Sequence, residues 1–125
     1  MEASLNLTDP QRGYLLGVDT GTSKTHALLA DLSGQVVGFG EAGPGNYESV
    51  GEEGLIKAMG LAVEGALDQA RLSKKDVIAM GFGLAGYDWP CERETMTRAI
   101  EALGILGAYD FVNDVRKLIR LPEPK

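Results

Sequence analysis

GVDTGTSKT, residues 17–25, is the segment from which the architecture of this chain can be worked out. The apolar run at residues 14–18 predicts a short buried strand that stops at the acidic residue Asp19, and a second apolar run resumes at residues 27–30. Polar residues fill the gap between the two runs. The segment is therefore predicted to form a tight hairpin with a carboxylate at its entrance and with hydroxyl groups, a glycine and a lysine in its bend.

The bend of this hairpin has the residue types of a phosphate-binding loop. Gly21 can adopt a positive φ and leaves its backbone uncovered, so successive N–H groups can converge on an anion. The hydroxyl groups of Thr22 and Ser23 would add donors, and Lys24 would add a positive charge. A turn that is merely polar, with a solvated lysine, is an equal alternative, because a short motif of this kind is not specific by itself.

Hydrophobic spacing in the rest of the chain predicts a mixed α/β domain. After the hairpin, a strand, a helix, a strand, a helix and a strand are predicted at residues 35–41, 52–70, 77–82, 90–103 and 109–112. The first of the two helices is preceded by a loop at residues 42–50 that is rich in glycine and proline. The predicted order of elements is β-β-β-α-β-α-β.

Two acidic residues, Asp19 and Asp114, each follow a predicted strand. Catalytic side chains of open α/β sheets usually lie at the carboxyl ends of the strands. We therefore expect the two carboxylates at the same edge of one sheet, with the bend of the hairpin between them and solvent. The alternative for Asp114 is an Asx turn or a helix cap after Asn113.

Composition and charge limit the classes of function. The length of 125 residues suits a single domain, and the formal net charge of −6 argues against a nucleic-acid or anionic-membrane surface, because such partners require clustered basic residues. The single cysteine, Cys91, excludes an internal disulfide and a cysteine-rich metal site. We expect no nucleic acid and no membrane among the partners.

The ends of the chain differ from its middle. Residues 1–12 contain acidic residues and a proline without an apolar core segment, so they predict a flexible tail and not a signal peptide. No apolar run approaches the roughly 20 residues that span a bilayer. The expected organisation is a tail at residues 1–12, a domain at 13–114 and an atypical tail at 115–125, where we expect a truncation. We expect a cytoplasmic protein.

The motifs together resemble the N-acetylglucosamine kinase and BadF/BadG/BcrA/BcrD-type ATPase family of the actin/hexokinase/heat-shock ATPase superfamily. The resemblance begins at the hairpin and continues through GPGNYESVGEEGL (residues 43–55), GFGLAGYDWP (81–90) and FVND (111–114). It implies the N-terminal half of such a protein. The implied fold is a ribonuclease-H-like (actin-like ATPase) half-domain, of class α/β, with a mixed sheet of about five strands in the order β-β-β-α-β-α-β.

The resemblance also implies an activity with its cofactors and site. The implied cofactors are ATP and Mg²⁺, and the implied substrate is N-acetylglucosamine or a related amino sugar. Asp114 is implied as the catalytic base that receives the proton of the sugar hydroxyl, and Asp19 as the residue that holds the metal through water. The remaining implied contacts are with the nucleotide phosphates and with the substrate: Gly21, Thr22, Ser23 and Lys24 for the phosphates, and Asn46, Asp88 and Asn113 for the substrate.

Simpler structural roles stay open for two of these residues. Asn46 could be a turn asparagine, and Asp88 could cap the helix that follows it. The resemblance is also compatible with a homodimer of the full-length protein.

The chain departs from the family pattern in two places. Thr22 and Ser23 stand where the family usually has glycine and threonine, which keeps hydroxyl donors. The family's second phosphate loop and its adenosine-binding half have no counterpart in the 125 residues. We therefore expect a fragment of a kinase that is inactive by itself.

Three rival functions are compatible with parts of the sequence. An activator ATPase of 2-hydroxyacyl-CoA dehydratases or benzoyl-CoA reductases would need cysteines for an iron–sulfur cluster, and only Cys91 is present. A ribonuclease-H-like nuclease would use Asp19 and Asp114 on two metals, against which the acidic balance counts. A non-catalytic sugar-binding fragment is the third.

Overall fold

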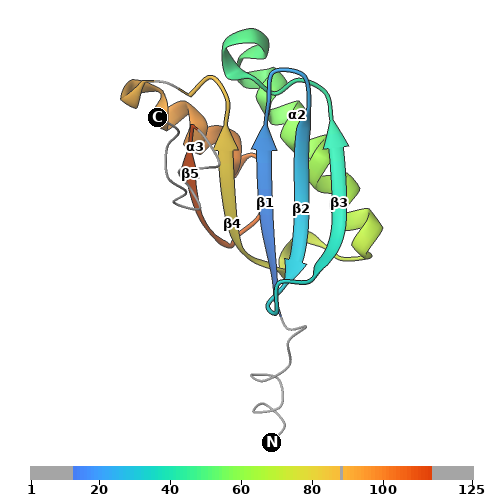
Figure 1. Cartoon of the computed structure of the whole chain (residues 1–125). Helices are drawn as coiled ribbons and strands as arrows, with labels where there is room; N and C mark the ends of the chain where they lie inside the picture. Colours follow the sequence, from blue (N-terminus) through green and yellow to red (C-terminus); the bar gives the residue numbers. More distant parts are fainter. Residues whose placement is uncertain (1–12, 88, 114–125) are drawn as a thin grey trace, which may run out of the picture.

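A computed structural model describes residues 13–87 and 89–113, so the predicted tails at 1–12 and 115–125 lie outside the described residues (Figure 1). The elements are, in chain order, β1 (Tyr14–Thr20), β2 (Thr25–Asp31), β3 (Val36–Ala42), α2 (Tyr47–Ala70), the 3₁₀ turn Lys74–Asp76, β4 (Val77–Leu84), the 3₁₀ turn Pro90–Glu92, α3 (Arg93–Glu101) and β5 (Ala108–Val112). This order confirms the predicted β-β-β-α-β-α-β arrangement.

The five strands form one mixed sheet in the order β3-β2-β1-β4-β5. β1 pairs antiparallel with β2, and β2 pairs antiparallel with β3. On its other side β1 pairs parallel with β4, which in turn pairs parallel with β5. Short turns can join only antiparallel neighbours, so the two helices serve as the longer connections that the parallel strands require.

The second predicted helix begins later than the sequence suggests. Pro90 was expected as its first residue, but Pro90–Glu92 is a 3₁₀ turn and α3 starts at Arg93. Proline has no backbone N–H, and the first N–H groups of a helix have no acceptor within it. Proline therefore fits the start of a 3₁₀ turn as well as the start of an α-helix. The apolar stripe is nevertheless placed as predicted, since Met96, Ala99 and Ile100 are buried.

Helix α2 contains a break that the sequence analysis did not predict. Residues 52–70 are helical as expected, but Gly51 has φ 74° and ψ −176°, a conformation that is essentially restricted to glycine. The residues before the break, Tyr47–Val50, form a separate helical turn that begins at Asn46. The loop predicted at residues 42–50 is thereby reduced to residues 43–46.

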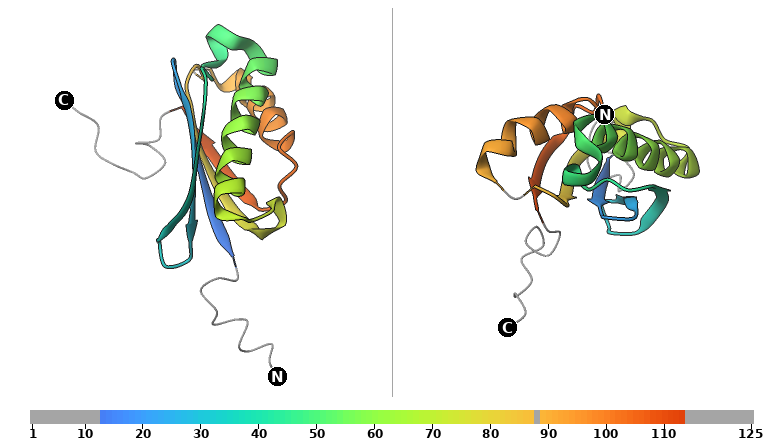
Figure 2. Two further views of the ribbon diagram at one scale, coloured as in Figure 1. Left: turned by 90° about the vertical axis from the view of Figure 1, so that its right-hand side faces the viewer. Right: turned by 90° about the horizontal axis from the view of Figure 1, so that it is seen from above.

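Both helices cover the same face of the sheet, and the other face carries no described element (Figure 2). The core lies between α2, α3 and the strand residues that alternate toward them, among them Leu16, Val18, Leu29 and Phe82. Helix α2 lies directly on the backbone of β3, because a Cβ at Gly40 would collide with the carbonyl oxygen of Ala62. Leu15, Leu28, Phe39 and Ile78 are about half exposed on the open face. Neither described helix is both long and apolar enough to cross a membrane.

Candidate active site at the carboxyl edge of the sheet

The register of the parallel strands brings the ends of β1 and β5 to one edge. Asp19 is aligned with Gly83 of β4, and Gly83 is aligned with Val112 of β5. With strands spaced 4.7–4.9 Å apart, the backbone of Asp19 and that of Val112 are about 10 Å apart. Asn113 follows at the same edge. The shared edge of the two strands agrees with the sequence analysis, whereas Asp114 lies outside the described residues and its position stays a prediction.

In the bend of the first hairpin, Gly21 allows a close approach between backbone atoms. The N–H of Gly21 donates to the carbonyl oxygen of Lys24 at 2.8 Å, which closes a bend of four residues between β1 and β2. Gly21 does not adopt the positive φ that is open to it. Glycine is needed there because a Cβ would lie 2.9 Å from the carbonyl oxygen of Lys24. Its N–H is therefore occupied, and the amides of Thr22 and Ser23, which have no acceptor among the described residues, are the ones left for an anion.

Three loops at this edge are joined by backbone hydrogen bonds. The N–H of Gly45, in the loop before α2, donates to the carbonyl oxygen of Gly21 at 3.0 Å. The N–H of Tyr47 donates to the carbonyl oxygen of Ala85, in the loop after β4, also at 3.0 Å. Ala85 in turn donates to the carbonyl oxygen and to the hydroxyl oxygen of Thr20, each at 3.1 Å. The phosphate-loop candidate and the two loops that carry substrate candidates thus form one connected unit.

Asn46 has a structural role, as a helix cap and not as the turn asparagine that the sequence analysis left open. Its side-chain Oδ1 accepts the N–H of Glu48 at 2.9 Å and caps the first turn of α2. Its side-chain nitrogen makes no hydrogen bond within the part of the chain that the structure describes. The cap therefore leaves a donor for a ligand. Asp88, the neighbouring substrate candidate, lies outside the described residues.

Gly86 fits closely against Asn46 from the loop after β4. It has φ +87°, and a Cβ there would lie 2.5 Å from Asn46 Oδ1 and 2.9 Å from the backbone nitrogens of Tyr47 and Glu48. Only glycine satisfies both the backbone conformation and the approach. Sequence reasoning noted Gly86 only as part of a chance match to a dinucleotide-binding pattern and gave it no role, because its role depends on a contact between two loops that are 40 residues apart in the sequence.

Thr25, the last residue of the segment at 17–25, is buried beneath the loop before α2. Its side chain is fully buried, and it is aligned with the equally buried Thr20 across the first hairpin. A Cβ at Gly45 would lie 2.5 Å from Thr25 Oγ1, so the loop before α2 passes directly over this hydroxyl. The hydroxyl has no hydrogen-bond partner among the described residues. Thr25 therefore packs under the loop before α2.

Asp19 lies on the open face of the sheet, in a row of polar residues across three strands. It is aligned with His26 of β2, which is aligned with Glu41 of β3. Lys24 Nζ is 3.3 Å from Glu41 Oε2, and His26 Nε2 is 3.6 Å from Glu41 Oε1. The predicted phosphate ligand Lys24 is therefore in an ion pair. The sequence analysis missed Glu41 because only the register between β2 and β3 reveals the contact.

The donor set fits a hydrated Mg²⁺ and not a cage made by protein alone. Asp19 is exposed and has no side-chain hydrogen bond or ion pair within residues 13–87 and 89–113. In the same residues no group of three or more His, Cys, Asp or Glu side chains could hold a metal ion. Mg²⁺ usually keeps several waters and binds through one or two carboxylates together with substrate phosphates. Asp19 beside the phosphate-loop candidate is compatible with that mode.

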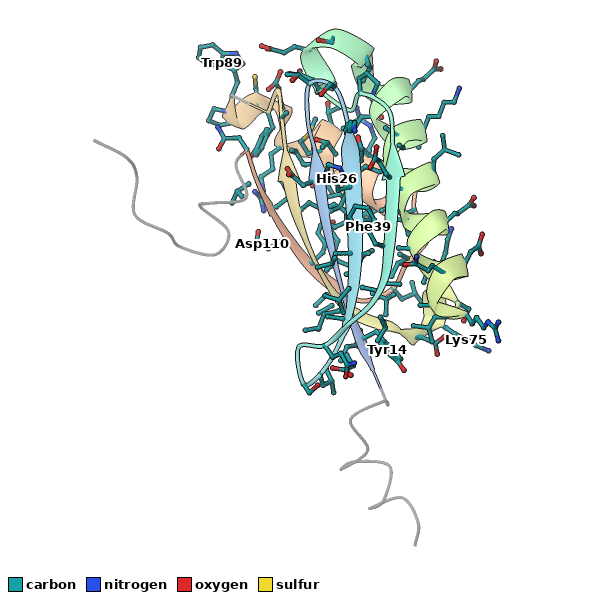
Figure 3. All side chains as sticks on the ribbon, turned by 45° about the vertical axis from the view of Figure 1, so that its right-hand side comes forward. Tyr14, His26, Phe39, Lys75, Trp89 and Asp110 are labelled. Atoms are coloured by element: carbon teal, nitrogen blue, oxygen red, sulfur yellow. The ribbon has the colours of Figure 1, made fainter. Side chains whose placement is uncertain are left out.

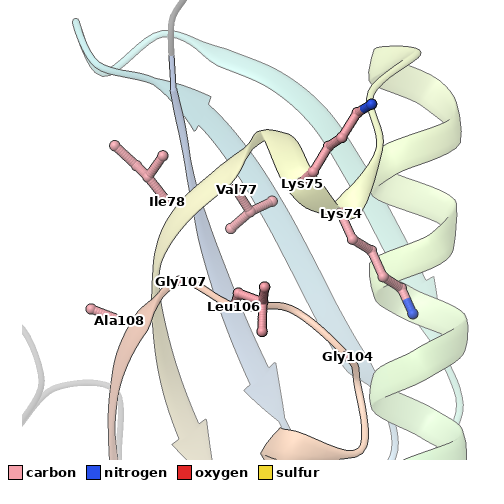
Figure 4. A pocket seen from close by; sticks show the side chains of 8 residues that line it. All are labelled: Lys74, Lys75, Val77, Ile78, Gly104, Leu106, Gly107 and Ala108. Atoms are coloured by element: carbon pink, nitrogen blue, oxygen red, sulfur yellow. The ribbon is translucent and has the colours of Figure 1, made fainter.

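A cavity of about 540 Å³ lies at the opposite edge, near the start of β4 and β5 (Figure 4). Its lining includes the apolar side chains of Val77, Ile78 and Ala108 and the two lysines Lys74 and Lys75. The two lysine side chains point away from each other and do not converge on a common point (Figure 4). It has no connection with the loops at the carboxyl edge.

Comparison with known proteins agrees with this geometry. The BadF/BadG/BcrA/BcrD ATPase family matches residues 16–102. The chain belongs to this family. A member of the BadF/BadG/BcrA/BcrD ATPase family is expected to use a nucleotide, and the matched residues include all three joined loops.

Two individual proteins are also similar to this chain. An N-acetylmuramic acid/N-acetylglucosamine kinase from Clostridium acetobutylicum is 29% identical over 101 residues, which are 81% of this chain and 33% of the kinase. The structure of a candidate N-acetylglucosamine kinase from Chromobacterium violaceum matches with a TM-score of 0.64 and 24% identity, over 82% of this chain and 35% of that one. The chain thus spans about a third of the length of these two proteins.

A third match bears on the fold alone. A Bacteroides thetaiotaomicron protein with an actin-like ATPase fold matches with a TM-score of 0.51 and 10% identity, over 96% of this chain and 42% of that one. Together with the sheet order, this match confirms the predicted actin-like half-domain of class α/β.

Proposed function

We propose that this member of the BadF/BadG/BcrA/BcrD ATPase family is the N-terminal part of an ATP-dependent kinase for N-acetylglucosamine or a related amino sugar. The observation that carries the proposal is the hydrogen-bonded unit formed by the bend after β1, the loop before α2 and the loop after β4. It joins phosphate-binding and substrate candidates at the edge where Asp19 lies. The kinase from Clostridium acetobutylicum supports the substrate class.

The residues of this chain would divide the work of phosphoryl transfer as follows. The free amides and hydroxyls of Thr22 and Ser23 would bind phosphate oxygens, and Asp19 would hold the metal through water. Mg²⁺, when bound, would offset phosphate charge. Asn46 would orient the sugar through its side-chain nitrogen, with Asp88 and Asn113 as further contacts. Asp114 would accept the proton of the attacking hydroxyl, the role of a general base.

The 125 residues by themselves would bind Mg·ATP weakly and would not turn over. The two kinase-like relatives are about three times as long as the matched region, so a nucleotide on this chain would lack most of the enclosing surface that a complete kinase provides. An open site cannot exclude water, which weakens every electrostatic contact with the phosphates.

The first test is binding by the isolated chain. Titration with Mg·ATP followed by NMR should shift resonances of the bend at residues 21–24, and titration with N-acetylglucosamine should shift Asn46 and its neighbours. Asp19→Asn should weaken the dependence of Mg·ATP binding on Mg²⁺. The matched control is Asp68→Asn, which makes the same charge change at an exposed position in the last turns of α2. Sugar binding without any response to Mg·ATP would instead indicate a non-catalytic sugar-binding fragment.

The second test uses a protein in which this chain is extended to the full length of its two kinase-like relatives. There Asp114→Asn should leave folding and nucleotide binding nearly intact and should reduce turnover by about 10² to 10⁴, the usual worth of a positioned general base. Asp19→Asn should change the Mg²⁺ dependence together with turnover. Wild-type turnover of amino sugars by the Asp114→Asn variant would show that Asp114 only forms a turn.

A further inference from the structure

Glu41 contacts the lysine of the proposed phosphate loop. One carboxylate oxygen, Oε2, lies 3.3 Å from Lys24 Nζ, and the other, Oε1, lies 3.6 Å from His26 Nε2. The Glu41 carboxylate thus contacts the bend through Lys24 and β2 through His26. Figure 3 shows the side chains on the ribbon and labels His26 and Phe39.

The register of the sheet produces this arrangement. Glu41 is aligned with His26 on the neighbouring strand, so both side chains lie on the open face. Lys24 lies one residue before β2, and its side chain contacts Glu41. The ring of Phe39 stacks on that of His26, with the centroids 5.5 Å apart and the planes at 29°. His26 is thereby held beside the carboxylate, and Glu41 is left to receive the flexible lysine.

The Lys24–Glu41 pair is weak enough to open when a stronger anion arrives. The side chain of Lys24 is 60% exposed and that of Glu41 is 44% exposed. Exposed pairs contribute little because water and salt screen them. A nucleotide polyphosphate carries several negative charges against the single charge of Glu41. Lys24 is therefore free to exchange partners.

We propose that Glu41 is a positioning residue that competes with the phosphates for Lys24, so that nucleotide binding requires the lysine to leave Glu41. This inference rests on the proposed function. The contact with Glu41 places Lys24 on the β3 side of the bend, and the carboxylate of Asp19 has no ion pair within residues 13–87 and 89–113. In the bound state Lys24 would contact phosphate, and Glu41 would keep its contact with His26.

The test is a double-mutant cycle on the whole 125-residue chain. The unaltered chain, Glu41→Gln, Lys24→Gln and the double variant are titrated with Mg·ATP and, separately, with inorganic pyrophosphate, at pH 8 and low salt. Glu41→Gln should tighten binding by about twofold to fivefold, the range expected for an exposed ion pair. The gain should vanish in the Lys24→Gln background and shrink as salt is added. Glu64→Gln, an exposed glutamate of α2 with no ion pair among the described residues, is the control and should change little.

Three outcomes would count against the inference, and they are distinguishable. Equal tightening with and without Lys24 would mean that Glu41 acts only through its charge. Weaker binding by Glu41→Gln would mean that the pair prepares Lys24 for phosphate instead of competing for it. If Mg·ATP and pyrophosphate shift no resonance of the bend in the unaltered chain, the proposed function fails first, and the role of Glu41 fails with it.

Discussion

Single glycines determine how closely the loops of the candidate site approach one another. Gly21 and Gly45 allow backbone to pass next to backbone or to a buried hydroxyl, and Gly86 adds a positive φ. Glycine is required at each of these three positions because a side chain there would block a close contact. A methyl group is therefore a sensitive probe of the site's geometry.

Gly86→Ala should destabilise the fold and loosen the loop that carries Asn46. An alanine there would hold a positive φ with its Cβ 2.5 Å from Asn46 Oδ1. The expected cost is about 1–3 kcal/mol in the free energy of unfolding. Urea denaturation of both variants measures it, with Gly17→Ala as the control, because a Cβ at Gly17 would meet no atom within 4 Å. Equal midpoints for the two variants would show that the loops are not packed as described.

At the scale of elements, the turn between β2 and β3 depends on one carboxylate. Asp31 Oδ1 accepts the N–H of Ser33 at 2.9 Å, the hydroxyl of Ser33 at 2.6 Å and the N–H of Gln35 at 3.0 Å. These hydrogen bonds, that of the Ser33 hydroxyl first, lower the pKa of Asp31 from its ordinary value of 3.8. The turn places β3, and therefore Glu41, in register with β2.

The stabilisation from Asp31 should depend on pH. Because the pKa is lower in the folded chain than in the unfolded one, the ionised carboxylate stabilises the fold above the unfolded pKa, and this stabilisation is lost as the pH falls through the folded pKa. Asp31→Asn should therefore lower the melting temperature at pH 7, and the difference from the unaltered chain should shrink below about pH 4. A difference that stays constant down to pH 2 would attribute the effect to shape and not to charge. Asp68→Asn controls for the change in net charge.

At the scale of the whole molecule, packing within the described residues is one-sided. The strand residues that face α2 and α3 are buried, whereas the opposite face exposes Leu15, Leu28, Phe39 and Ile78. Parallel strands such as β1, β4 and β5 are usually covered on both faces. The stability of the described domain must therefore come from the helix-covered side.

Truncating one side chain on each face of the sheet tests whether the stability comes from the helix-covered face. Met59→Ala, at a fully buried position of α2, should cost about 2–5 kcal/mol because it opens a cavity in the core. Leu28→Ala, at a position that is 41% exposed on the open face, should cost about 1 kcal/mol or less. Denaturant titration of the two variants compares them directly. A large cost for Leu28→Ala would reveal that something covers the open face in solution.

The order of elements and the edge that carries the candidate site could be read from local patterns. Apolar alternation, helical stripes and turn residues depend on neighbours within a few positions, so the five strands, the helix at residues 52–70 and the shared edge of β1 and β5 were predicted. The positions of Asp88 and Asp114 stay predictions, since both lie outside the described residues.

Contacts between strands and loops that are distant in the sequence could not be read in this way. The pairing of Lys24 with Glu41 follows from the alignment of His26 with Glu41, which itself depends on a register shift between Leu29 and Ala30. The use of Gly21 for close approach and the fit of Gly86 against Asn46 likewise exist only once the loops are packed. Register and loop packing arise from the summed burial of the whole sheet, and no short stretch of sequence encodes that sum.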